Sequence, residues 1–201
     1  MSATLTANTF LGTATANAAT VFGNPSAWKP NVLSIVILLI AYIHYQWIMQ
    51  ESSMENIKWK NIEWYRHSDW MITCPLLVYE LAYLKGFEPF GADASSVGVA
   101  AGAALFMVLA GWRARLQAGL SRVMWWGVGA VCLGIIYSQL LRPTDDKDQP
   151  QWPDAFLWLW IPYGIVFWAP DALRQTLYNV LDILSKSGLG LAVAYASLTA
   201  R

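Results

Sequence analysis

Charged residues are scarce in this chain of 201 residues: Asp, Glu, Lys and Arg together make up 13%, and the net charge is zero. A soluble domain of this size usually carries about 25% charged residues. Without an excess of positive charge, the chain has no electrostatic basis for binding a phosphate backbone. We therefore expect no nucleic-acid partner.

Cysteine is also rare, with only Cys74 and Cys132, and both lie in apolar runs. Such thiols are more often packing residues than parts of a disulfide or metal site, so no metal site is expected. The sequence has no glycine-rich phosphate-binding loop. Its N-terminus lacks a basic stretch followed by an apolar one, so we expect no cleaved signal peptide.

Hydrophobic residues, in contrast, make up 56% of the chain, and 12 residues are tryptophan. Aromatic side chains collect at membrane–water interfaces and around bound ligands. Together with the low charge, this composition indicates an integral membrane protein located in the cell membrane.

Long apolar segments recur along the chain, and about 20 such residues cross a bilayer as a helix. Six segments qualify: residues 31–50, 61–84, 95–112, 121–141, 153–169 and 172–198. Residues 4–23 are more polar but uncharged, and their small side chains suit a helix packed inside a bundle. We predict an all-α membrane protein, a single domain over residues 1–201 with seven transmembrane helices, or six if residues 4–23 are not one.

Two carboxylates, Asp69 and Glu80, lie in the mostly apolar stretch of residues 67–80 inside the second segment. Their separation of 11 residues is about three helical turns, so both lie on one face, roughly 16 Å apart along the axis. Arg66 and Thr73 lie one turn before and one turn after Asp69 on the same side. These charges could simply mark helix ends at the water interface. Two acids so close on one helix instead favour an ion or proton path.

The last apolar segment contains Asp182 and Lys186, four residues apart and therefore on one helix face. One interpretation is a neutralising ion pair. The other is that Lys186 is an amine that forms a Schiff base, a reaction for which a desolvated lysine is suited.

Two motifs join these observations: R-x-x-D-W-x-x-T-x-P-L-L at residues 66–77 and Y-N-x-x-D-x-x-x-K at residues 178–186. In order and spacing they resemble the third and last helices of microbial (type 1) rhodopsins. The resemblance implies a seven-helix bundle enclosing all-trans retinal, bound covalently to Lys186 as a protonated Schiff base. Asp69 and Asp182 would then balance the charges of this Schiff base and of Arg66, as a buried ionic site requires.

The same match assigns the walls of a retinal pocket, although ordinary aromatic core packing is the alternative for these side chains. The residues are Trp70, Leu77, Trp126, Trp160, Tyr163 and Phe167. Leu77 stands at the position that tunes colour in proteorhodopsins. Trp126 fills the place of the small residue that admits a carotenoid in some relatives, which argues against a carotenoid antenna.

The triplet Asp69, Thr73 and Glu80 resembles that of outward proton pumps of the proteorhodopsin and xanthorhodopsin type. By this match Asp69 is counterion and proton acceptor, Asp182 is a second counterion, and Glu80 is the proton donor, kept protonated by apolar surroundings. His44, in a His-Tyr pair, is expected to hydrogen-bond to Asp69, although a core histidine bonded elsewhere is the alternative.

Other activities stay open. The short chain and Cys74, directly after Thr73, resemble inward-pumping schizorhodopsins, but those carry an aromatic residue where Asp69 stands. A photosensory rhodopsin and a structural membrane protein whose charges only pair helices are further alternatives.

The resemblance places the N-terminus outside and implies a homo-oligomer, a pentamer or trimer. Lys and Arg are not enriched on the cytoplasmic side in this orientation, so the orientation depends on the resemblance.

Overall fold

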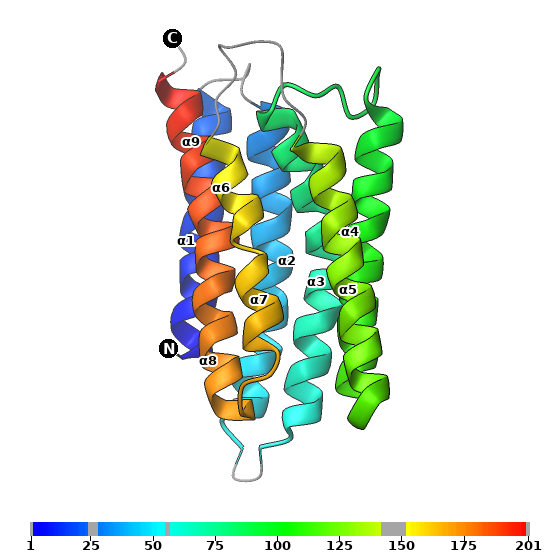
Figure 1. Cartoon of the computed structure of the whole chain (residues 1–201). Helices are drawn as coiled ribbons and strands as arrows, with labels where there is room; N and C mark the ends of the chain where they lie inside the picture. The colour runs from blue at the N-terminus through cyan, green and yellow to red at the C-terminus, as the bar shows by residue number, and fades with distance from the viewer. Residues whose placement is uncertain (1, 24–27, 55–56, 142–151, 200–201) are drawn as a thin grey trace. The chain divides into compact units, whose positions relative to one another are not determined.

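The computed structural model describes residues 2–23, 28–54, 57–141 and 152–199, and in these ranges every regular element is helical. The elements are α1 (Ala3–Gly23), α2 (Trp28–Ser52), α3 (Trp59–Leu84), α4 (Ala94–Arg115), α5 (Gly119–Leu140), α6 (Trp152–Trp158), α7 (Ile161–Val166), α8 (Asp171–Asp182), the π-helical segment η2 (Ile183–Ser187) and α9 (Gly188–Thr199). Figure 1 shows α8, η2 and α9 as one uninterrupted run. Counting that run and the α6–α7 pair as one passage each, the chain has the seven helical passages predicted, and residues 4–23 form the first of them.

Four of the described helical stretches are long and apolar enough to cross a membrane by themselves. They are Lys29–Ser52, Ala94–Arg115, Gly119–Leu140 and Asp171–Thr199. The α3 helix has sufficient length, 26 residues, but it carries Arg66, Asp69 and Glu80 in its interior. These polar groups lower its hydropathy, and they are the groups on which the functional hypothesis depends.

The passage expected over residues 153–169 is divided into α6 and α7 by a turn at residues 159–160. Pro162 explains the interruption. Proline has no N–H to donate to the carbonyl of residue 158, and its ring collides with the preceding turn. Both halves are helical, and the interruption is the local distortion expected from a proline inside a membrane helix.

The last passage contains a wider turn that the sequence pattern did not predict. The N–H of Gly188 donates to the carbonyl of Ile183, five residues earlier, which is the π-helical spacing. Single π turns inside α-helices occur frequently at functional sites. This one contains Lys186.

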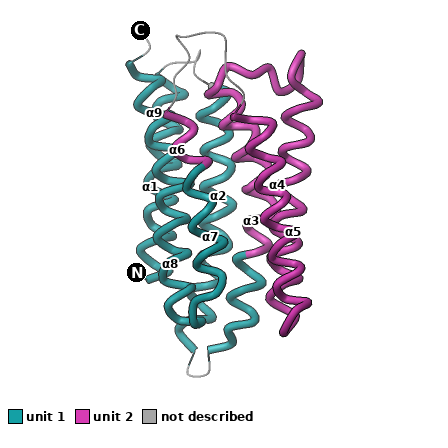
Figure 2. The backbone as a smooth tube through the Cα atoms, in the orientation of Figure 1, with its two compact units in different colours: residues 1–66, 158–201 teal, residues 67–157 magenta. Residues whose placement is uncertain are grey.

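The chain divides into two compact units, residues 1–66 with 158–201 and residues 67–157 (Figure 2). The first has a core between α1 and α2, consisting of Ala7, Phe10, Ala14, Leu38, Ala41, Tyr45, Ile48 and Ile62. The rings of Phe10 and Tyr45 meet edge to face, with centroids 5.1 Å apart. Such pairs add to the stabilisation that comes from burial alone.

Close contact between α1, α2 and α9 requires glycine at position 190. The amide of Asn17 donates to the Gly190 carbonyl at 3.1 Å, which joins α1 to α9. A Cβ at position 190 would lie 3.1 Å from the Thr13 methyl group and 3.2 Å from a Leu38 methyl group. Gly190 is four residues beyond Lys186, so this packing holds the lysine-bearing passage against α1 and α2.

A buried ion pair joins α3 to α8 inside the first unit. Nε and Nη2 of Arg174 both donate to Oε1 of Glu63, and both residues are less than 5% exposed. Arg174 also donates to the Ala169 carbonyl and to the half-exposed carboxylate of Asp171. A buried guanidinium needs hydrogen-bond acceptors for most of its N–H groups, because an unpaired buried charge is costly.

The second unit is built around the alanine-rich helix α4. Its buried residues include Ala100, Ala104 and Ala114. A Cβ added to Gly129 of α5 would lie 3.5 Å from the carbonyl oxygen of Met107 on α4. Small residues at such positions let helices approach closely in a membrane. How the two units combine into the single predicted domain stays a prediction.

Replacing Gly190 with valine should destabilise the protein, because the added atoms overlap Thr13 and Leu38. Overpacking of this kind costs about 1–3 kcal/mol. Unfolding in sodium dodecyl sulfate would measure the loss. Gly134→Val is the matched control, since a Cβ there meets nothing within 4 Å. Equal losses in both variants would contradict the packing described.

Replacing Arg174 with methionine should lower the free energy of unfolding by about 3–5 kcal/mol, because the Glu63 carboxylate stays buried without its main partner. The double variant Glu63→Leu with Arg174→Leu should lose clearly less, since no buried charge then remains. The same detergent titration compares them. A double variant less stable than the single one would refute this account of the ion pair.

Candidate functional site

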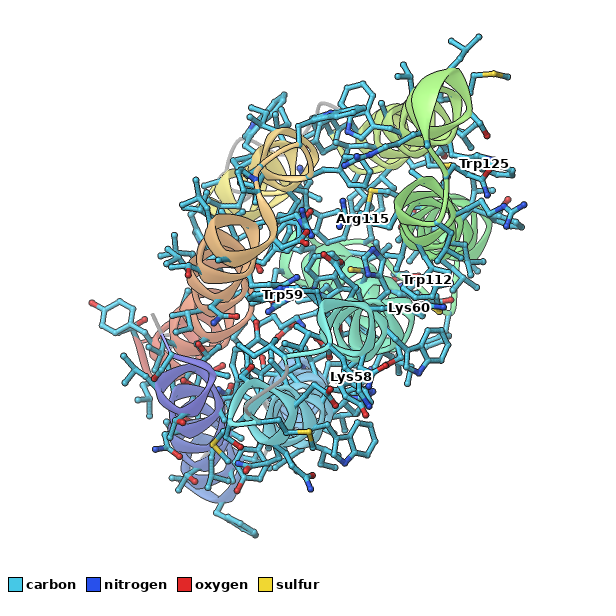
Figure 3. The ribbon with its side chains drawn as sticks, turned by 90° about the horizontal axis from the view of Figure 1, so that it is seen from below. Lys58, Trp59, Lys60, Trp112, Arg115 and Trp125 are labelled. Carbon is cyan, nitrogen blue, oxygen red and sulfur yellow. The ribbon has the colours of Figure 1, made fainter. Side chains whose placement is uncertain are left out.

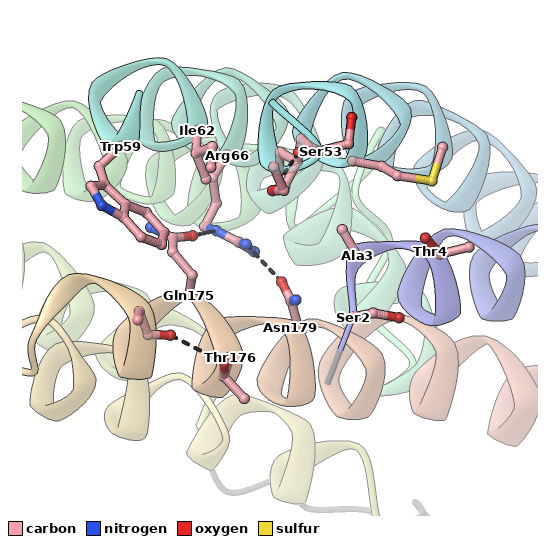
Figure 4. Close-up of a pocket in the computed structure, with 14 residues that line it drawn as sticks. Ser2, Ala3, Thr4, Ser53, Trp59, Ile62, Arg66, Gln175, Thr176 and Asn179 are labelled. Carbon is pink, nitrogen blue, oxygen red and sulfur yellow. Dashed lines mark hydrogen bonds between the residues drawn. The ribbon is translucent and has the colours of Figure 1, made fainter. Parts of the chain in front are cut away.

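Arg66 is the centre of a fully buried hydrogen-bond network in the first unit. Its Nη1 donates to Oδ2 of Asp182 at 3.0 Å and to the hydroxyl of Tyr45. Its Nε donates to Gln175 at 2.9 Å and its Nη2 to Asn179 at 2.7 Å, as Figure 4 shows. Because the guanidinium is a rigid planar fork, four acceptors on α2 and α8 fix both its position and its orientation.

Asp182 ends α8 and is completely buried. Its carboxylate accepts hydrogen bonds from Tyr45 at 2.6 Å, from Tyr163 at 2.8 Å and from Arg66. Because Tyr163 has already donated its single proton to Asp182, the Ser185 hydroxyl is the donor in the 2.9 Å contact between them. Three donors on α2, α3 and α7 therefore stabilise the ionised form of this acid.

Lys186 lies in η2, one turn beyond Asp182, and is 3% exposed. Its Nζ lies 5.8 Å from the centre of the Phe10 ring on α1. A cation over an aromatic face is stabilised at this distance. The predicted Schiff-base lysine is thus a buried amine on the same helical face as the carboxylate expected to balance it.

The predicted aromatic residues of the first unit lie around the α6–α7 break. Trp160 and Phe167 are 6% and 4% exposed. Tyr163 stacks on Tyr178 with ring centroids 5.7 Å apart, and Tyr178 in turn lies under the Arg66 guanidinium. The turn before Pro162 thus places Trp160 and Tyr163 at the start of a new helix instead of on one long face.

The predicted acids of α3 lie on one continuous helix and are both buried, Asp69 at 0% and Glu80 at 1% exposure. Thr73 donates its hydroxyl to the Asp69 carbonyl at 2.9 Å, within the helix. Trp70 and Leu77, on the same helix, are buried, and Trp126 on α5 is partly buried. Both carboxylates are therefore interior groups of this helix and not charges at its ends.

His44 is buried on α2, and its Nδ1 lies 2.9 Å from the Ile40 carbonyl, to which it can only donate. In a neutral ring Nε2 is then an acceptor, and an ionised carboxylate has no proton to give. The predicted bond between His44 and Asp69 therefore requires one added proton, on the imidazole or on the acid. That pairing stays a prediction.

A pocket of about 400 Å³ opens beside Arg66, between α1, α2, α3 and α8. Figure 4 shows Gln175 and Asn179 on α8 facing Arg66 across it. Its wall also contains Trp59, which Figure 3 shows on the α8 side of α3, whereas Lys58 and Lys60 lie on the other side. The pocket gives polar access to the buried arginine from the end of the unit where α1 begins.

Several network residues were not among the predicted site residues: Tyr45, Glu63, Arg174, Gln175 and Asn179. The sequence contains a spacing pattern that could have identified two of them. Gln175, Asn179, Asp182 and Lys186 follow one another at intervals of four, three and four residues, which is one helical face. The Gln175 amide also donates to Glu63 at 2.9 Å, so it connects the arginine centre to the Glu63–Arg174 ion pair.

Comparison with known proteins agrees with these features. Residues 1–200 match the model of the family described as bacteriorhodopsin-like protein. Sensory rhodopsin-2 from Natronomonas pharaonis is 28% identical over 155 residues, 68% of this chain and 62% of that protein. Cruxrhodopsin-3 from Haloarcula vallismortis is 28% identical over 190 residues, 80% of this chain and 74% of that one. The chain thus spans less than two thirds of the first of these relatives.

Solved structures show the same fold at low identity. A viral rhodopsin, OLPVRII, superposes with a TM-score of 0.82 at 23% identity, covering 98% of this chain and 96% of that one. A blue light-absorbing proteorhodopsin from Med12 gives 0.78 at 20% identity, covering 98% and 94%. Schizorhodopsin 4 gives 0.77 at 14% identity, covering 96% of each.

The family match covers nearly the whole chain, and the structural matches share its arrangement of seven helices. Members of the family are multi-pass membrane proteins that bind retinal through a lysine Schiff base and act as light-driven transporters or sensors. The chain therefore belongs to the bacteriorhodopsin-like family and is a microbial, type 1 rhodopsin of the membrane.

Proposed function

We propose that this protein is a light-driven outward proton pump with all-trans retinal bound to Lys186. The observation that carries the proposal is the pair of buried carboxylates on α3, Asp69 and Glu80. They lie about 16 Å apart along one helix. In the family fold, the first is adjacent to the Schiff base and the second lies on the cytoplasmic side of it.

The residues of the first unit fit the cofactor. Lys186 supplies a buried amine, Phe10 lies below that amine, and Trp160, Tyr163 and Phe167 supply aromatic surface. When bound, retinal supplies a light-driven isomerisation and a protonated link at the Lys186 nitrogen. The acidic partner for this positive nitrogen inside the same unit is Asp182, whose carboxylate accepts hydrogen bonds from three donors.

Charge balance determines where the proton goes. The Lys186 nitrogen and Arg66 carry two positive charges in the dark, and Asp69 and Asp182 carry two negative ones. When the proton moves from the Lys186 nitrogen to Asp69, the remaining charges are the Arg66–Asp182 pair, and the site is still neutral. Both states therefore satisfy the requirement that buried charges be compensated. Because Arg66, Tyr45 and Tyr163 already donate to the Asp182 carboxylate, we take Asp69 as the proton acceptor.

Glu80 returns the proton to the Lys186 nitrogen. An acid donor must be protonated in the dark, and burial among apolar groups favours the neutral carboxyl. Glu80 is 1% exposed and lies between Leu77 and Leu81, both of which are buried. Asp69 lies nearer the Arg66 end of α3 and Glu80 nearer the other end. With the N-terminus outside, as the resemblance implies, the Arg66 end of α3 faces outward and the proposed direction is outward.

One alternative function has an observation in its favour, since sensory rhodopsin-2 is a relative at 28% identity. A sensor needs no fast proton donor, so Glu80 favours the pump. The fold does not separate an outward from an inward pump, because proteorhodopsin and schizorhodopsin 4 match it almost equally. Asp69 favours outward release. Assembly as a trimer or pentamer stays part of the proposal.

Adding retinal to the purified protein should produce a visible absorption band, and Lys186→Ala should abolish it, because the proposed attachment is to the Lys186 amine. Borohydride reduction followed by mass spectrometry should place a retinyl group on the peptide that contains Lys186. Lys58→Ala is the control and should keep the band. A band that survives in Lys186→Ala would refute the proposed attachment.

Illuminated cells that make the protein and receive retinal should acidify a weakly buffered medium, and a protonophore should abolish the signal.

Asp69→Asn should shift the band and stop transport, because the acceptor is lost. Glu80→Gln should keep the band and slow photocycle recovery by about 10²-fold or more, since general acid catalysis contributes that much. Alkalinisation by the unaltered protein would show inward transport, and normal recovery in Glu80→Gln would remove Glu80 as donor.

A further inference from the structure

A second ion pair, outside the retinal site, lies in the unit formed by residues 67–157. Lys85 follows α3 directly, and its Nζ contacts Oδ1 of Asp154 in the first turn of α6. The lysine side chain is 6% exposed and the aspartate side chain 30% exposed. The pump mechanism described above uses neither residue, and the pair connects two segments that are far apart in the sequence.

The pair lies at the Glu80 end of α3. Lys85 is five residues beyond Glu80, about 7.5 Å along the helix axis. Its backbone N–H donates to the carbonyls of Leu81 and Ala82 at 3.0 and 3.1 Å, so it still belongs to the last turn. The backbone of Lys85 is therefore fixed about one and a half turns beyond the buried Glu80.

The partner helix, α6, depends on side-chain contacts for its position. It has seven residues and ends at the turn before Pro162, so it receives no support from a continuous helix. Two side-chain bonds attach it to its unit: Lys85 to Asp154 at its start, and the Tyr137 hydroxyl to the Leu157 carbonyl, at 2.8 Å, near its end. Isolated helices of this length are unstable without such contacts.

A mostly buried lysine ammonium is costly to leave without its carboxylate partner. If the pair breaks, the ammonium must reach water, which separates the end of α3 from the start of α6. Water can then approach Glu80 from this end. With the pair intact, the end of α3 and the start of α6 stay joined and shield the buried Glu80 from water at this end.

We propose that the Lys85–Asp154 ion pair closes the Glu80 end of this unit and limits the rate at which water and protons reach Glu80. Lys85 and Asp154 are positioning residues that act through Glu80. The inference rests on the proposed function, because it takes Glu80 as the proton donor. Breaking the pair should speed proton uptake without changing the colour of the dark protein.

Three variants of the retinal-bearing protein test this: Lys85→Met, Asp154→Asn, and the charge-exchanged pair Lys85→Asp with Asp154→Lys. One measurement is amide hydrogen exchange in the dark, followed by mass spectrometry over residues 77–84. The other is proton uptake after a flash, followed with a pH-indicating dye. Each single variant should be about three- to tenfold faster in both, because the aspartate is partly exposed and the pair is worth little more than a surface ion pair. The exchanged pair should return to within about twofold of the unaltered rates.

Tyr137→Phe is the matched control, because it removes the other side-chain bond of α6 and leaves the ion pair in place. It should leave exchange around Glu80 and proton uptake unchanged. An equal acceleration in this variant would mean that any loosening of α6 suffices, which overturns the assignment to the ion pair. Single variants with unaltered rates, or an exchanged pair as fast as the single variants, would overturn it as well.

The outcome is separable from that of the proposed function. Amide exchange is measured in the dark and does not require transport in either direction. If illuminated cells fail to acidify the medium while the exchange results follow the expected order, outward pumping fails and the closing role of the ion pair stands. If transport is outward and the exchange rates do not differ, the ion-pair proposal alone is refuted.

Discussion

The buried guanidinium of Arg66 is the group on which the arrangement of the first unit depends. Four acceptors surround it, contributed by α2 and α8, and one of them is the Asp182 carboxylate. A guanidinium without such partners would be too costly to bury, and the buried Asp182 carboxylate likewise needs its three donors. The two charges therefore require each other, and together they determine how α2, α3 and α8 pack around the lysine-bearing turn.

The network also explains why α3 can be so polar. A membrane helix with an arginine and two acids is unfavourable alone, and α3 does not qualify as a span by hydropathy. Its polar groups are buried inside the protein, where partners from other helices satisfy Arg66 and the helix's own backbone satisfies Thr73. In the proposed function these polar groups serve transport, with Asp69 accepting a proton and Glu80 returning it.

Two irregularities in the helices place the cofactor residues. Pro162 divides the sixth passage, so that Trp160 and Tyr163 belong to a turn and a new short helix. The π turn at Ile183–Ser187 contains Lys186 and changes the angular relation between the lysine and the residues after it. The broken sixth passage also leaves α6 as a short helix held by side chains. Its ion pair to the end of α3 thereby becomes a means of controlling access to Glu80.

The sequence by itself determined the class of protein, the helical passages to within a few residues, and the identity of the central residues. Long apolar runs have one stable form in a bilayer, and the spacing of Arg66, Asp69, Thr73 and Glu80 is a local property of one helix. The motif around Lys186 was equally local.

Only the tertiary structure revealed the partners, since contacts such as Arg66 with Gln175, Tyr45 with Asp182 and Lys85 with Asp154 join residues 69 to 137 positions apart. It also decided where Pro162 breaks its helix and where the π turn forms, because packing against neighbouring helices selects among backbone hydrogen-bond patterns that a single helix tolerates almost equally.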